Sequence, residues 1–510
     1  MKNANRFVAA LGAAVATTLL LSACFPFSLL GEPKQTKASG DAPATAQEFY
    51  AQTATWKTCA AEIECADVYA PLDWQNVGSE GAISLRLTRH VATGADRLGS
   101  LFVNPGGPGA SGAEFVAQSV DRASSKALQE SYDIIGWDPR GVGDSTAIEC
   151  YDPAGMDEYI FGLPKNTPRT DAWITEMRES TANYGAACEE QSGELLANVD
   201  TINTAHDLDM LRSVVGDKKL NYIGYSYGTL IGAYYAELYP KRVGRVVLDG
   251  VVDPTATMFD TVLFQTKGFE QSLRNYLAWC LDQNDCPFTS TVDDAAKSIA
   301  QLLAKVEANP LRGEDGRMLG TGTLITAIIY PLYDEGSWPY LNQLFSQLRS
   351  GETQMAFTLA DSYYSRDTDG TYLDNSNEAF AAINCLDYAR ETDVNVMKKN
   401  AALIEAEAPI FGKYQGYGEL ACADWPVPAK TMRQEITAKG SAPILVIGTT
   451  QDPATPYQNA VNLSKTLDNG YLVTYNGEGH TAYMRGSECV DAVVDDYLLT
   501  GKVPSSDPQC

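Results

Sequence analysis

A predicted strand that runs straight into a serine flanked by glycines is the feature that most restricts the fold of this chain. The strand spans Leu220 to Ile223, the serine stands in Gly224-Tyr225-Ser226-Tyr227-Gly228, and Thr229 to Tyr239 has a helical pattern. A side chain presented on so sharp a turn needs glycine two positions before and after it, because a larger residue would collide with the crossing backbone. We therefore expect Ser226 to be a nucleophile at the edge of a sheet.

Strands and helices alternate on both sides of this turn. Such alternation predicts an α/β fold in which a mainly parallel sheet is covered by helices on both faces. The further strands that we predict are Ile83 to Val91, Ser100 to Val103, Tyr132 to Trp137, Arg245 to Leu248, Ile444 to Gly448 and Tyr471 to Tyr475.

Helical periodicity replaces the alternation between about Pro254 and Pro426. One example is the run Ile299, Leu302, Leu303, in which apolar residues recur at helical spacing. We predict a mostly helical lid inserted into the core, with residues 48–254 as the first part of the core, 255–425 as the lid and 426–510 as the C-terminal part of the core.

A serine hydroxyl becomes a nucleophile only beside an imidazole that takes its proton and a carboxylate that orients the imidazole. In folds of this type the chain order is serine, carboxylate, histidine. His480 is the one histidine after Ser226, and it follows a predicted strand. We expect it to be the base, and we expect His90, inside a strand, and His206, at a helix start, to be structural.

The carboxylate should follow the preceding strand. Asp452 stands after Ile444 to Gly448 and 28 residues before His480, which favours it over a simple turn-forming role. Glu478 is the alternative.

Acyl transfer also needs backbone N–H groups that stabilise a developing oxyanion. Tyr227, the residue after the nucleophile, can supply one of them. Asn104-Pro105-Gly106-Gly107-Pro108-Gly109 follows an early strand and can supply the second, from Gly107. An ordinary glycine and proline turn is the alternative for this segment.

The N-terminus has the features of an export signal. A basic start is followed by the 15 apolar residues Phe7 to Leu21, a run too short to span a bilayer, and then by Ser22-Ala23-Cys24. The ending resembles the lipobox of bacterial lipoproteins, in which the cysteine is lipidated. We expect a signal peptide over 1–23, a lipid anchor to the cell membrane at Cys24 and a flexible tether over 24–47. Simple secretion is the alternative.

The other ten cysteines form an even set, which in an exported protein favours disulfides over metal sites or reactive thiols. Their connectivity does not follow from the count, and we hypothesise that neighbours in sequence pair. The five bridges are then Cys59 with Cys65, Cys150 with Cys188, Cys280 with Cys286, Cys385 with Cys422 and Cys489 with Cys510. We expect no metal site.

The formal net charge of −27 argues against nucleic acid as a partner, because a phosphate backbone would be repelled. Four segments together resemble the exported tripeptidyl aminopeptidases of actinobacteria, which are relatives of the proline iminopeptidases in the α/β-hydrolase superfamily. These segments are the one from Asn104 to Gly109, Gly136-Trp137-Asp138-Pro139-Arg140-Gly141-Val142-Gly143-Asp144-Ser145, the serine turn, and Val247 to Pro254.

The resemblance implies an α/β-hydrolase fold and no cofactor. It also implies a catalytic triad of Ser226, Asp452 and His480, with Gly107 and Tyr227 as oxyanion donors. Asn104 stands where proline iminopeptidases usually have histidine. This departure leaves the oxyanion glycines intact, and we do not extend the resemblance to the details of the substrate pocket.

An aminopeptidase must also bind the free ammonium of its substrate, which calls for a carboxylate. Asp387 is our first candidate, and the others are Glu114, Asp249 and Asp253. We expect a monomeric serine exopeptidase that releases short peptides, in particular tripeptides, from free N-termini. The alternatives are a carboxylesterase or lipase with the same triad, and a peptide-binding surface lipoprotein without catalysis.

Overall fold

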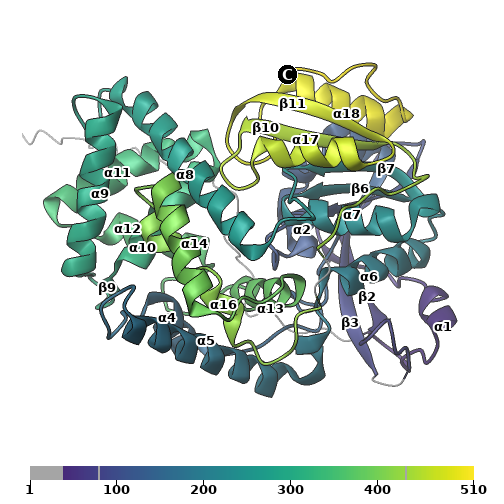
Figure 1. The fold of residues 1–510 in the computed structure, drawn as a ribbon. Coiled ribbons are helices and arrows are strands. Elements are labelled where there is room, and N and C mark those ends of the chain that lie inside the picture. The colour runs from purple at the N-terminus through teal and green to yellow at the C-terminus, as the bar shows by residue number, and fades with distance from the viewer. Residues whose placement is uncertain (1–37, 79–80, 431–432) are drawn as a thin grey trace, which may run out of the picture.

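The computed structural model describes residues 38–78, 81–430 and 433–510 (Figure 1). The predicted signal peptide, Cys24 and residues 24–37 of the predicted tether lie outside them. Within these ranges, no helix is both long and apolar enough to cross a membrane.

A nine-stranded sheet forms the centre of one half of the molecule, in the order β1-β2-β3-β5-β4-β6-β7-β10-β11. The strands from β5 to β11 in this order are parallel to one another, and β1, β2 and β3 form an antiparallel edge. The fold class is confirmed. The strands are β1 (Lys57–Ala60), β2 (Ile63–Pro71), β3 (Ala82–His90), β4 (Gly99–Asn104), β5 (Tyr132–Trp137), β6 (Leu220–Tyr225), β7 (Val243–Asp249), β10 (Ile444–Gln451) and β11 (Gly470–Glu478).

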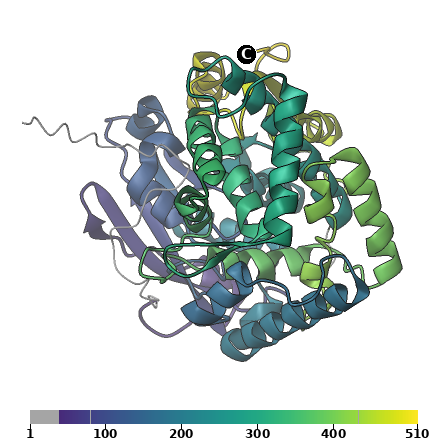
Figure 2. The same cartoon turned by 90° about the vertical axis from the view of Figure 1, so that its left-hand side faces the viewer.

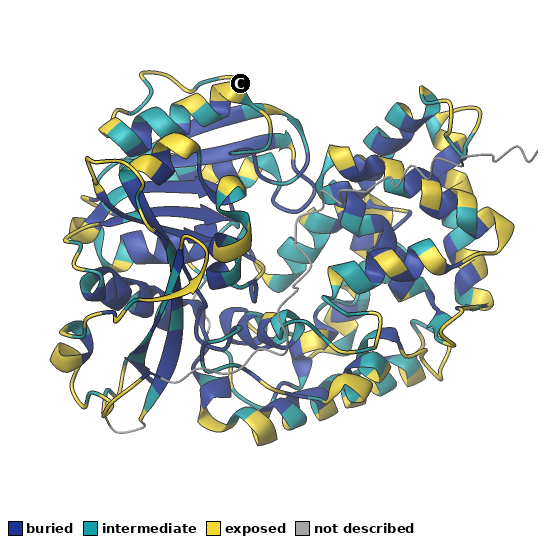
Figure 3. Ribbon diagram, turned by 180° about the vertical axis from the view of Figure 1, so that it is seen from behind, coloured by how far each residue is buried: buried dark blue, intermediate teal, exposed yellow. Residues whose placement is uncertain are grey.

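Helices cover both faces of this sheet, because successive side chains of a strand point to opposite sides. Tyr222 of β6 packs into one apolar core and Ile223 into another. The first core includes α1 (Ala46–Tyr50), α6 (Thr201–Val214), α7 (Tyr227–Leu238) and α17 (Tyr457–Thr466), and the second includes α2 (Gly112–Ala123), α3 (Lys126–Ser131) and α18 (Glu488–Thr500). Figure 3 shows the sheet buried between these helices, which are exposed on their outer sides.

Between β7 and β10 the chain forms a helical region with a core of its own, built around residues such as Leu277, Leu303 and Ile328 (Figure 2). Its helices are α8 (Met258–Leu281), α9 (Val292–Ala308), α10 (Thr321–Ile329), α11 (Trp338–Ser350), α12 (Gln354–Tyr363), α13 (Ser376–Asp387), α14 (Val394–Glu407), α15 (Gly412–Gln415) and α16 (Leu420–Ala423). The short 3-10 helix η3 (Tyr330–Tyr333) and the two-residue strands β8 (Leu311–Arg312) and β9 (Met318–Leu319) belong to the same region.

Two helices from the first part of the chain also join this helical region. They are α4 (Pro153–Phe161) and α5 (Asp171–Ser192), which lie beside α10, α13 and α16 in Figure 1. Phe161 packs into the core of the region, and Ile174 packs with Met397 and Leu420. The predicted bounds of core and lid had assigned this segment to the core.

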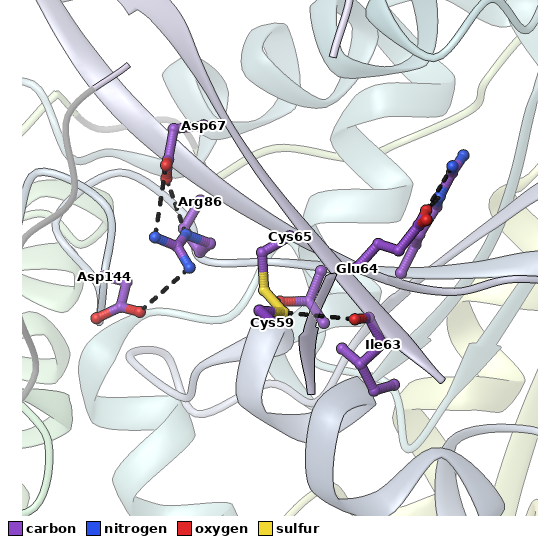
Figure 4. The surroundings of a disulfide bond; sticks show 9 residues. Cys59, Ile63, Glu64, Cys65, Asp67, Arg86 and Asp144 are labelled. Atoms are coloured by element: carbon purple, nitrogen blue, oxygen red, sulfur yellow. Dashed lines mark hydrogen bonds and ion pairs between the residues drawn. A yellow bond between two sulfur atoms is a disulfide. The ribbon is translucent and has the colours of Figure 1, made fainter. Parts of the chain in front are cut away.

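All five predicted disulfides are present. Cys59–Cys65 ties β1 to β2 at the antiparallel edge, where Arg86 forms ion pairs with Asp67 and Asp144 (Figure 4). The other four tie the loop after β5 to α5, close the end of α8, join α13 to α16, and fix the C-terminus to α18.

Candidate active site

Ser226 occupies a sharp turn between β6 and α7. Its backbone angles, φ 54° and ψ −123°, are strained for a residue with a side chain, and its N–H donates to the carbonyl of Asp249. A Cβ on Gly224 would lie 2.3 Å from the carbonyl oxygen of Gly228, so the turn admits only glycine there. The Ser226 side chain makes no capping bond to α7, which leaves its hydroxyl available for chemistry.

His480 and Asp452 meet at the carboxyl ends of β11 and β10. The imidazole Nδ1 lies 2.9 Å from each oxygen of the Asp452 carboxylate. Both residues are held in place. Asp452 is buried, and the backbone N–H of His480 donates to the carbonyl of Tyr333 in η3. The predicted partners are therefore brought together, whereas the alternative carboxylate, Glu478, bonds to Asn275 instead.

Further donors fix the Asp452 carboxylate. The backbone N–H groups of Ala454, Thr455 and Thr481 donate to it, and so does the hydroxyl of Thr455. The same hydroxyl lies 3.2 Å from Nδ1 of His480. Sequence reasoning missed Thr455, although it stands three residues after Asp452, within reach of a turn that begins at the aspartate.

Asp249 links the serine turn to the histidine loop. Its carbonyl accepts the N–H of Ser226, and its buried carboxylate accepts the N–H groups of Ala482 and Tyr483, just after His480. Burial raises the pKa of this carboxyl to about 6. The next residue, Gly250, packs so closely that a Cβ on it would lie 3.2 Å from Cε1 of His480. Ser226 and His480 thus both lie against the short segment formed by Asp249 and Gly250.

The loop that follows β4 passes directly over the nucleophile. A Cβ on Gly106 would lie 2.8 Å from Cβ of Ser226 and 3.1 Å from the backbone N of Tyr227, so only glycine permits this approach. The Asn104 side chain accepts the N–H of Gly106 and supports the loop. Gly107, our predicted oxyanion donor, is the next residue, with φ 105°.

Each carboxylate that we considered for the substrate ammonium already has neighbours. Asp387 is buried and accepts both the N–H and the hydroxyl of Thr201, which also bonds to the phenol of Tyr227. The Asp249 carboxylate holds the histidine loop, as described above, and Asp253 bonds to Thr255.

Glu114 is the fourth candidate. It lies in the first turn of α2, and its carboxylate accepts a hydrogen bond from the side-chain amide of Gln118. Burial, reinforced by the charge of Asp374, raises its pKa to about 7. A substrate ammonium nearby would favour its charged form.

The remaining predicted residues have structural surroundings. His206 contacts the hydroxyl of Tyr239, and His90 is buried in β3. Arg140 is fully buried, pairs with Asp207 and donates to three backbone carbonyls, those of Pro71, Leu72 and Asn198. In the part of the chain that the structure describes, no three His, Cys, Asp or Glu side chains gather as metal ligands.

Aromatic side chains of the helical region approach the imidazole. The ring of Tyr333 lies 5.6 Å from that of His480, edge to face. In the same helical region, the ring of Tyr363 lies 5.9 Å from that of Tyr330 and 5.2 Å from that of Tyr364.

The parallel sheet, the strained serine and the Asp–His pair at the same edge define an α/β hydrolase of the serine type. Family models agree: residues 99–314 match the "alpha/beta hydrolase fold" and residues 408–510 match "TAP-like protein". The chain belongs to this family of serine hydrolases, and it is an enzyme.

Curated relatives span most of the chain. It is 37% identical over 464 residues to "Serine protease Hip1" of Mycobacterium tuberculosis, covering 88% of this chain and 87% of the relative. It is 31% identical to "Tripeptidyl aminopeptidase" of Streptomyces lividans, covering 89% and 86%. It is 34% identical to "Carboxylesterase B" of Mycobacterium tuberculosis, covering 91% and 88%. The expected family resemblance is confirmed.

Solved structures of α/β hydrolases are more distant. An acetylester hydrolase from Corynebacterium glutamicum has 13% identity and a TM-score of 0.39, with 86% of this chain and 96% of that chain covered. Proline iminopeptidase from Mycobacterium smegmatis has 13% identity and a TM-score of 0.33, with 85% and 98% covered.

Proposed function

We propose that this serine hydrolase is an exopeptidase that releases short peptides, in particular tripeptides, from free N-termini. The observation that carries the catalytic part is the contact of His480 Nδ1 with both oxygens of Asp452, at the sheet edge where Ser226 sits on its strained turn. A hydroxyl, an imidazole and an oriented carboxylate in this order form the apparatus of acyl transfer.

In the proposed reaction, the Ser226 hydroxyl attacks the scissile carbonyl while His480 accepts its proton. The imidazolium, stabilised by Asp452, then protonates the departing amine, and an acyl-enzyme ester remains on Ser226. Water attacks this ester with His480 again as base, which releases the peptide acid and restores the serine.

The oxyanion formed in both steps needs preorganised donors. We assign this role to the backbone N–H groups of Tyr227 and Gly107. The close approach of Gly106 to Ser226 and to the N–H of Tyr227 supports the assignment, because it brings the loop to the nucleophile.

Two observations favour peptide substrates with a free amine. One relative, 31% identical over most of both chains, carries the name tripeptidyl aminopeptidase. Glu114, in the helix that begins after the oxyanion loop, has its pKa raised to about 7 by burial. An ammonium group would stabilise its ionised form, so this carboxyl is our choice for binding the substrate N-terminus.

Tripeptide anilides with free and with acetylated N-termini test the proposal. We expect the enzyme to hydrolyse the free forms at the bond between the third residue and the anilide. For the acetylated forms we expect kcat/KM to be at least about tenfold lower. Ser226→Ala should fold with an unchanged thermal unfolding temperature and show no turnover and no fluorophosphonate labelling. Wild-type turnover by this variant would refute the role of Ser226.

A carboxylesterase is the second candidate, because another relative carries that name at 34% identity. Short-chain esters assayed beside the anilides distinguish the two functions. An esterase would hydrolyse the esters and treat free and acetylated peptides alike. A chain that fluorophosphonate does not label at Ser226 would instead be a binding protein without catalysis.

We also propose that the mature protein is anchored to the cell membrane through a lipid on Cys24. The Leu-Ser-Ala-Cys ending of the apolar N-terminal run supports this assignment. Mass spectrometry of the mature N-terminus would reveal the acyl chains, and Cys24→Ala should release the protein from the membrane fraction. An unmodified cysteine would favour secretion.

A further inference from the structure

Helix α8 of the helical region lies against the two strand ends that carry Asp452 and His480. Figure 1 shows α8 running from the sheet half of the molecule to the helical half, beneath the loops that follow β10 and β11. Gly268 on this helix packs so tightly that a Cβ on it would lie 2.3 Å from the carbonyl oxygen of Pro453. The side chain of Gln265 donates to the carbonyl of Ala454.

One side chain of α8 contacts both strands at once. The Asn275 amide nitrogen lies 2.8 and 3.0 Å from the two oxygens of Glu478, at the end of β11. It also lies 3.5 Å from the amide oxygen of Gln451, at the end of β10. Gln451 and Glu478 are partners in the register of the two strands, so a single amide group joins that pair.

Gln451 and Glu478 stand close to the two proposed catalytic residues in the sequence. Gln451 immediately precedes Asp452, and Glu478 stands two residues before His480. Any shift of β11 against β10 at this point would move the imidazole relative to its carboxylate. Further bonds hold the same loop. The backbone N–H of His480 donates to the carbonyl of Tyr333, and the hydroxyl of Ser272 of α8 donates to the neighbouring carbonyl of Leu332.

The Asn275 amide also stabilises the carboxylate of Glu478. Its side chain is half-buried, and burial, together with the charge of Glu335, raises its pKa. The Asn275 amide donates to both carboxylate oxygens, which offsets the cost of burying them.

We propose that Asn275 is a positioning residue that holds the ends of β10 and β11 in register, so that His480 stays aligned with Asp452 and Ser226. This inference rests on the proposed triad. The helical region thereby contributes to catalysis through the geometry of the imidazole, beyond any contact with substrate. Displacements of about 1 Å in such a group can lower turnover by about a hundredfold.

The first test replaces Asn275 by alanine. We expect kcat to fall about tenfold or more with KM within about twofold, because substrate contacts are retained while the alignment of the base is lost. Labelling of Ser226 by fluorophosphonate should slow by the same factor, since it needs the Ser–His pair and no peptide pocket. Asn275→Ser, which is too short to reach both strands, gives the same readout if the alanine variant does not fold.

Lys267→Ala is the matched control. Lys267 lies on the same helix and bonds to Glu407 of α14, away from the triad strands. The Lys267→Ala substitution removes one side-chain contact of α8 and leaves the contacts of α8 with β10 and β11 in place. We therefore expect turnover and fluorophosphonate labelling close to those of the unmodified enzyme. If it lowered both as much as Asn275→Ala, general packing of the helix would explain the effect and the proposal would be wrong.

A polarity swap gives the sharpest test. Asn275→Asp alone sets a second carboxylate against Glu478 and should lower kcat at least as far as alanine. In the double variant Asn275→Asp, Glu478→Gln, the amide donor is on residue 478 and the carboxylate acceptor is on residue 275. We expect most of kcat and of the labelling rate to return in this variant. A double variant no faster than Asn275→Asp would overturn the proposal.

The two proposals can fail separately. Unchanged kcat and labelling in a folded Asn275→Ala variant would refute the positioning role and leave the triad untouched. Labelling of Ser226→Ala at the wild-type rate would refute the triad, whatever Asn275 does.

Discussion

The hydroxyl of Thr455 lies 3.2 Å from Nδ1 of His480 and donates a hydrogen bond to Asp452. It therefore contacts both members of the pair that orients the proposed base. A side chain in this position limits rotation of the carboxylate and of the imidazole together, which is the kind of support that a preorganised site requires.

Thr455→Val should lower kcat about tenfold, because the methyl group fills the space of the hydroxyl but cannot bond to Asp452. KM should change by less than about twofold, since Thr455 orients the base and is not assigned to substrate binding. Steady-state kinetics on a tripeptide anilide measures both. Thr455→Ser, which keeps the hydroxyl, is the control, and equal kinetics for the valine and serine variants would show that the hydroxyl is dispensable.

Asp249→Asn should lower the free energy of unfolding by about 2 kcal/mol. The variant keeps one acceptor oxygen but points an amide N–H₂ at the backbone donors of the histidine loop, Ala482 and Tyr483. Chemical denaturation measures the change. Asp253→Asn is the control: among the described residues, the Asp253 carboxylate bonds to the nearby Thr255 alone, so this change should alter stability by less than about 0.5 kcal/mol. Equal effects of the two variants would contradict the anchoring role.

Stability should fall as the pH rises from about 5 to 8, in part because of Glu378. This residue is 8% exposed, one of its carboxylate oxygens has no hydrogen-bond partner among the residues that the structure describes, and burial raises its pKa to about 7. Between pH 4.5 and 7 the folded chain keeps a proton that the unfolded chain has released, so the stabilisation is complete below this range and lost above it.

Glu378→Gln removes this titration. We expect the loss of unfolding free energy between pH 5 and 8 to shrink by up to about 3 kcal/mol in the variant, as measured by denaturation at each pH. Glu314→Gln, at an exposed position, is the control and should follow the unmodified protein. An unchanged pH profile in Glu378→Gln would show that this carboxyl is ionised in the folded protein.

Removing the Cys385–Cys422 disulfide should destabilise the protein more than removing Cys59–Cys65. The two bonds close segments of 37 and 6 residues, so chain entropy predicts losses of about 4 and about 2 kcal/mol. Paired Cys→Ala variants compared by denaturation test the difference. A larger loss from the shorter loop would mean that native packing around the sulfurs outweighs the entropy of the unfolded chain.

Much of the geometry of the candidate site could be predicted because it depends on local rules. The glycines around Ser226 announce a close backbone crossing, and that crossing is present at Gly228. The contact between Asp452 and His480 could be predicted from their places after two strands, since parallel strands bring their carboxyl ends to one edge. The disulfides follow the order of the cysteines along the chain.

The parts that were missed depend on contacts between distant segments. Asn275 and Glu478 are 203 residues apart, and neither belongs to a motif that announces the other. Asp387 is our first sequence candidate for the substrate ammonium, and its bonds to Thr201, 186 residues away, are likewise not encoded by any local pattern. No periodicity or spacing encodes such pairings, because they arise from how whole helices pack against the sheet.

The order of the proposed reacting groups along the chain has a consequence for synthesis. The proposed nucleophile, Ser226, follows β6, whereas the imidazole of His480 follows β11, 254 residues later. A ribosome must therefore add these 254 residues after the nucleophile before all the proposed reacting groups exist. Chains that stop short of His480 lack the proposed base, and a cell that makes this enzyme is spared hydrolysis by such unfinished copies.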